Sequence, residues 1–66
     1  MYETMKDINA DIARDIARVK VDNLEVADKA SIIEAVRDSV RSQIKDIDDA
    51  EEVIAEILWD EYNIEE

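Results

Sequence analysis

The sequence predicts an all-α fold, a small three-helix bundle with helices over about residues 2–20, 31–46 and 49–62. In three separate stretches, apolar residues recur at intervals of three and four positions, as on one face of an α-helix. Capping signals precede the second and third of these stretches. The 66 residues include no Gly and no Pro, so the predicted boundaries depend on caps and periodicity. A chain of this length forms one domain at most, and we expect a single acidic helical domain over residues 1–66.

The first helix is predicted from an apolar stripe with intervals of 3, 4, 4 and 3 residues, made of Met5, Ile8, Ile12, Ile16 and Val19. This stripe is narrow, closer to a coiled-coil seam than to a broad core face. A narrow seam can be buried against a second copy of the chain, so we expect a homodimer. The alternation of Val19 and Val21 leaves a short strand over residues 18–21 as an alternative, and that strand would need a second chain to pair with.

Two capping boxes define the middle of the chain. Asp22 with Glu25 predicts a turn or short helical segment over about residues 22–29, and Ser31 with Glu34 predicts the start of the second helix. The stripe of the second helix repeats the same intervals and consists of Ile33, Val36, Val40, Ile44 and Ile47. We therefore expect the second helix to bury this stripe in the bundle.

Seven of the eight basic residues lie on the first two predicted helices, and Lys29 lies in the segment between them. Arg37, Arg41 and Lys45 form a strip at i, i+4 and i+8 beside the second apolar stripe. We expect this strip to face the acidic third helix of the same molecule or of a dimer partner, with a phosphate contact as the alternative. In the first helix, acids and bases at i, i+3, such as Asp15 and Arg18, are typical of a solvated face.

The third helix has an apolar and an acidic side. Asp48 with Glu51, or Asp49 with Glu52, predicts its start, and its stripe consists of Ala50, Val53, Ile57, Glu61 and Ile64. Glu52, Glu56 and Asp60 form a like-charge ladder outside that stripe, with no base on the same helix and with Trp59 beside it. Like charges at i, i+4 destabilise a helix, and an exposed Trp is enriched at binding hot spots. The alternative places Trp59 at the bundle edge or in a dimer seam.

The negative charge is concentrated at one end of the chain. The sequence has 19 acids and 8 bases, a formal net charge of −11. Residues 1–45 hold nine acids and all eight bases, whereas residues 46–66 hold ten acids and no base. A uniform adaptation to high salt would not predict this division. The charge excludes a nucleic-acid binder that works through basic patches, and it argues against anionic membranes, so the expected partner is a basic protein surface.

Missing residue types exclude most catalytic and metal chemistry. Without His or Cys there is no Ser-His-Asp triad, no thiol nucleophile and no ordinary zinc site. Without Gly there is no phosphate-binding glycine loop. The segment 46–49 resembles the opening of a calcium loop but has Glu51 in place of its Gly and Ile57 in place of its final Glu. We expect no enzyme activity, no cofactor and no metal site.

No apolar run approaches the ~18 residues of a membrane span, and the N-terminus lacks a signal core. A cytoplasmic location in a bacterial, archaeal or host cell is expected.

The predicted function is that of a small protein-interaction module whose acidic C-terminal helix docks on a basic partner surface. Its specific form would be a DNA-mimic-type inhibitor of a nucleic-acid-binding protein. The predicted partner-binding residues are Glu52, Glu56, Asp60 and Trp59. The alternative is a self-associating structural or regulatory homodimer whose acidity serves solubility only.

Overall fold

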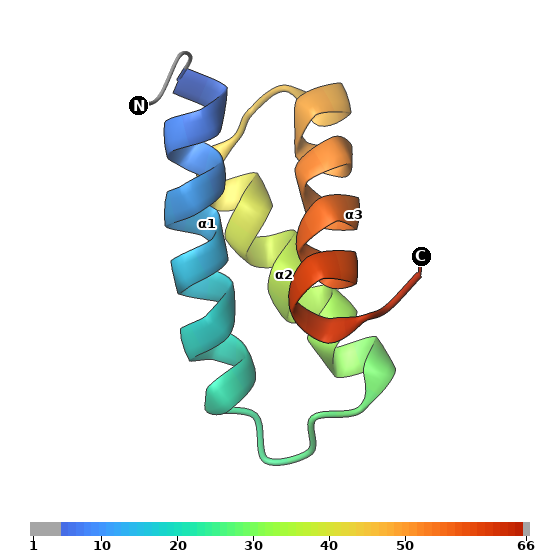
Figure 1. The fold of residues 1–66 in the computed structure, drawn as a ribbon. Coiled ribbons are helices and arrows are strands. Elements are labelled where there is room, and N and C mark those ends of the chain that lie inside the picture. Colours follow the sequence, from blue (N-terminus) through green and yellow to red (C-terminus); the bar gives the residue numbers. More distant parts are fainter. Residues whose placement is uncertain (1–4, 66) are drawn as a thin grey trace.

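The computed structural model describes residues 5–65, which form a bundle of three α-helices: α1 (Met5–Asp22), α2 (Lys29–Gln43) and α3 (Ile47–Tyr62). In Figure 1, α1 and α3 run upright while α2 crosses obliquely behind them. The backbone of α2 packs most extensively on α1, and α1 and α3 make the fewest backbone contacts. The predicted fold class is therefore confirmed. The alternative strand at 18–21 is wrong, because those residues continue α1. Residues 2–4 of the predicted first helix lie outside the described part of the chain.

Two aspartates cap the later helices. The backbone N–H of Ser31 donates to Asp28 Oδ1 at 2.9 Å, and that of Asp49 donates to Asp46 Oδ1 at 3.0 Å. A capping side chain accepts from the backbone N–H two or three residues further on, so Asp28 and Asp46 are the N-caps of α2 and α3, which begin at the next residue. The predicted caps at Ser31 and at Asp48 or Asp49 are thus placed two to three residues too late. Residues 23–28 form the connecting turn.

The core is built chiefly on α3. Its fully buried side chains are Ile54, Ile57 and Leu58, which pack with Val36 and Val40 of α2. From α1 the core receives Ala13 and Ala17, both without exposed surface. The buried Ser39 hydroxyl donates to the carbonyl oxygen of Ala35 at 2.8 Å, so its polar group is satisfied within α2. The predicted apolar faces of α2 and α3 therefore form most of the core, except for Ile47, which is 70% exposed.

The aliphatic stripe of α1 is not the face that enters the core of the bundle. Met5, Ile12 and Val19 of its stripe are 68%, 42% and 60% exposed, and Ile8 and Ile16 are only partly buried. At about 100° per residue, the buried alanines lie roughly 120° around the helix from the centre of that stripe. Small alanine side chains let α1 approach α2 closely, and this orientation also directs Lys6, Arg14 and Arg18 toward α3. The aliphatic stripe is consequently left on the outside of the bundle.

Candidate interaction surfaces

The four predicted partner-binding residues lie together on one side of α3. The side chains of Glu52, Glu56 and Asp60 are 66%, 59% and 48% exposed, and Trp59 is 55% exposed. They follow one another along the helix because their spacing places them on neighbouring turns. The sequence thus predicts their grouping and their exposure.

The acidic ladder is paired with bases of α1, and the sequence does not predict these pairs. Lys6 Nζ lies 3.0 Å from Glu52 Oε1, and the hydrogen bond with Glu52 raises the pKa of Lys6. Arg14 Nη2 lies 3.7 Å from Glu56 Oε1 and 3.6 Å from Asp60 Oδ2. Exposed pairs of this kind contribute little to stability, because water screens them. They nevertheless hold the carboxylates in place and neutralise part of their charge.

A better shielded contact joins the C-terminal ends of α1 and α3. Arg18 Nε donates to Glu61 Oε1, and the Glu61 side chain is only 20% exposed. This hydrogen bond holds the pKa of the Glu61 carboxyl below its usual value. Glu61 is the one acid in the predicted apolar stripe of α3. The contact with Arg18 explains how a carboxylate occupies that position at the edge of the core.

The basic strip of α2 also faces α3. Arg37 Nη1 and Arg41 Nη2 lie 3.5 and 3.4 Å from Glu51 Oε1. These contacts confirm that the strip faces the acidic helix of the same molecule, for two of its three bases. The third, Lys45, is exposed in the short connection between α2 and α3. The bases of α1 and α2 therefore flank α3 from two sides.

Trp59 borders a hollow at the end of α3. The hollow has a volume of about 500 Å³ and is lined by Ala55, Trp59, Ile64 and Glu65. The backbone of Asn63 is left-handed, with φ 55° and ψ 38°, and ends the helix. The N–H of Ile64 then donates to the carbonyl oxygen of Leu58 at 2.9 Å. This turn brings an aliphatic residue beside the exposed indole, so the surface around Trp59 is both apolar and acidic.

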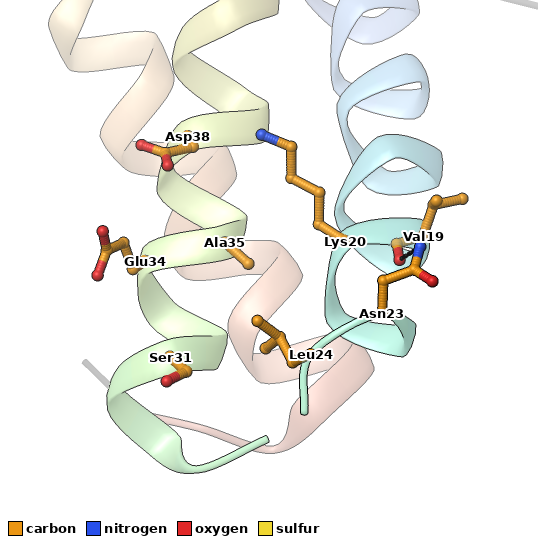
Figure 2. A pocket seen from close by; sticks show the side chains of 8 residues that line it. All are labelled: Val19, Lys20, Asn23, Leu24, Ser31, Glu34, Ala35 and Asp38. Carbon is orange, nitrogen blue, oxygen red and sulfur yellow. Dashed lines mark hydrogen bonds between the residues drawn. The ribbon is translucent and has the colours of Figure 1, made fainter. Parts of the chain in front are cut away.

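A second hollow, of about 470 Å³, lies between the end of α1 and the start of α2 (Figure 2). Leu24 of the connecting turn points into the space between the two helices, and Lys20 extends from α1 toward α2. The lining combines these residues with Val19, Asn23, Ser31, Glu34, Ala35 and Asp38. The sequence does not predict this hollow, because no single helical stripe contains its residues.

The described residues offer no metal centre and no membrane span. Within 5–65, no group of three or more acidic side chains is arranged to hold a metal ion. None of the three helices is long and apolar enough to cross a membrane. Comparison with protein-family models, curated proteins and solved structures finds no match to this chain. The surfaces described above are therefore the basis for any statement about function.

Proposed function

We propose that this protein is a small interaction module that binds a basic protein surface through the outer face of α3. The α3 outer face comprises Glu52, Ala55, Glu56, Trp59 and Asp60 on the helix, with Ile64 beside them. The observation that supports the proposal is the half-exposed Trp59, which borders an apolar hollow and adjoins three exposed carboxylates.

This combination suits the side chains of lysine and arginine. Their charged groups form strong hydrogen bonds with carboxylates, and they are also attracted to the face of an indole ring. Their aliphatic stems can pack on apolar surface such as that of Ala55 and Ile64. A partner that presents Lys or Arg next to an apolar residue would match both parts of the α3 outer face. Trp is also among the residues that dominate binding energy in protein interfaces.

The bases of α1 alter both the mobility and the effective negative charge of the acidic ladder. Lys6 and Arg14 restrain the carboxylates, which lowers the entropy lost when a partner orders them. They also reduce the negative field, so binding should depend less steeply on salt than ten unpaired acids would imply. Duplex DNA presents an unpaired charge every ~1.7 Å of its axis, whereas the rungs of this ladder are ~6 Å apart. The narrower proposal of a DNA-mimic-type inhibitor therefore has less support than docking on a basic protein surface.

Affinity capture with the immobilised full chain at low salt tests the proposal. The informative variant neutralises the ladder, as Glu52→Gln, Glu56→Gln and Asp60→Asn. A matched control neutralises three exposed acids elsewhere, as Glu25→Gln, Glu34→Gln and Asp38→Asn, and so has the same net charge. We expect a partner that elutes from the wild type as salt rises, binds the control and is lost from the ladder variant. Equal retention by both variants would show that only net charge matters.

A further inference from the structure

A second interaction surface lies on α1, and it is independent of the α3 outer face. The α1 seam comprises Met5, Ile8, Ile12, Ile16 and Val19. Three of these residues, Met5, Ile12 and Val19, are 68%, 42% and 60% exposed. Single exposed aliphatic side chains are normal on a protein surface, but a continuous row marks an interaction site. From Met5 to Val19 this row is roughly 21 Å long, most of the length of α1.

The two edges of the α1 seam carry opposite charges. At about 100° per residue, Asp15 lies roughly 60° to one side of the centre of the stripe and Lys20 roughly 80° to the other. Asp15, Ile16, Val19 and Lys20 line a hollow of about 400 Å³ on the outside of α1. The side chain of Asp15 is 80% exposed, and its contact with Arg18 is long, at 4.0 Å. Lys20 is exposed and forms no ion pair with the other described residues. Both charged groups are therefore accessible.

We propose that the α1 seam binds a second copy of the same chain, with the two α1 helices parallel. In a parallel helix pair, flanking residues five positions apart face each other across the seam. Asp15 of each copy would then meet Lys20 of the other copy, which gives two ion pairs related by the two-fold axis. An antiparallel pair would instead place Asp11 and Asp15 against the same two residues of the second copy. The charges on the edges thus favour a second copy in the parallel arrangement.

The same features predict a weak dimer. A stable interface buries about 800 Å² on each partner, and one helix face of this length supplies less. The formal net charge of −11 on each chain opposes association, and Glu34 and Asp38 lie near Lys20 in the hollow of Figure 2. We therefore expect a dissociation constant above ~1 µM. Added salt should strengthen this dimer by screening the repulsion, in contrast to binding at the α3 outer face.

Sedimentation equilibrium of the full chain, from micromolar to millimolar concentration, tests the proposal. We expect the mass to rise toward twice the 7.6 kDa of one chain. Ile12→Glu should keep the protein monomeric throughout this range while its helical circular dichroism is unchanged, because Ile12 is 42% exposed. A wild-type chain that remains monomeric at millimolar concentration would overturn the proposal. So would a dimer that persists in the Ile12→Glu variant.

A charge exchange tests the parallel arrangement and guards against a folding defect. Asp15→Lys and Lys20→Glu should each weaken the dimer at least several-fold, and the double variant should restore it. A double variant no better than the single variants would contradict the parallel pairing. Trp59→Ala is the control for the other surface and should leave the dimer intact. If Trp59→Ala abolished the dimer instead, self-association would belong to the α3 outer face and this proposal would be wrong.

Discussion

The orientation of α1 gives the sharpest prediction about the fold. Ala17 is fully buried in the core, whereas Ile12 is 42% exposed on another face of the helix. Ala17→Leu inserts a larger side chain into a packed core, and overpacking of this kind costs about 1–3 kcal/mol. Ile12→Ala removes apolar atoms that already lie partly in water. Full burial of an isoleucine contributes about 1.5–3 kcal/mol. Ile12 is a little over half buried, and alanine retains part of that burial. Ile12→Ala should therefore cost about 1 kcal/mol or less.

The assay is urea unfolding followed by circular dichroism at sub-micromolar concentration, where the proposed dimer is mostly dissociated. We expect Ala17→Leu to lower the free energy of unfolding more than Ile12→Ala does. Ala13→Leu provides a second measurement at the same contact and should behave like Ala17→Leu. If Ile12→Ala were the most destabilising of the three, the aliphatic stripe would be the core face and the orientation of α1 described here would be refuted.

Three further predictions concern the carboxylate contact, a cap and the core. Glu61→Gln should destabilise the protein at neutral pH. The folded-state pKa of Glu61 lies below its usual value of 4.5, so its contribution is present above that pH and is lost as pH falls through the folded pKa. Unfolding of the wild-type and Glu61→Gln chains at pH 7 and below pH 4 measures this loss. A difference in their free energies of unfolding that does not change with pH would contradict it. Asp46→Ala should cost about 1 kcal/mol as the loss of an N-cap, and Asp48→Ala, at a non-capping position, should cost less. In urea unfolding, Ile57→Val should cost about 0.5–1.5 kcal/mol and the same change at the exposed Ile47 almost nothing; equal effects would contradict their assigned burial.

The sequence predicts α3 better than α1 for a physical reason. In α3 the large apolar residues and the acids lie on different sides, so only one face can enter the core. In α1 two apolar faces compete, the aliphatic stripe and the small face of Ala10, Ala13 and Ala17. Hydrophobic periodicity favours the larger side chains. Close packing of helices favours the small face, and that preference depends on a neighbouring helix that one sequence stretch does not reveal.

The sequence predicts those features of the candidate site that depend on one helix, and it does not predict those that depend on contacts between helices. The grouping of Glu52, Glu56, Asp60 and Trp59 is a property of one helix, so sequence spacing predicts it. The ion pairs with Lys6 and Arg14 join residues far apart in the chain and depend on the packing of α1 against α3. The hollow beside Trp59 likewise depends on the left-handed turn at Asn63. These tertiary features determine how much negative charge the ladder presents to a partner.

The most direct test of the proposed function is the affinity of the captured partner for the Trp59→Ala chain. Trp59 is the sole tryptophan, so its fluorescence reports binding by the wild-type chain, and calorimetry serves for the variant. Val26→Ala is the control, since Val26 is 70% exposed in the turn between α1 and α2. A hot-spot tryptophan contributes about 2 kcal/mol or more, so Trp59→Ala should weaken binding about 30-fold while Val26→Ala does not. Equal affinities for the two variants would contradict the proposal that the α3 outer face binds the partner.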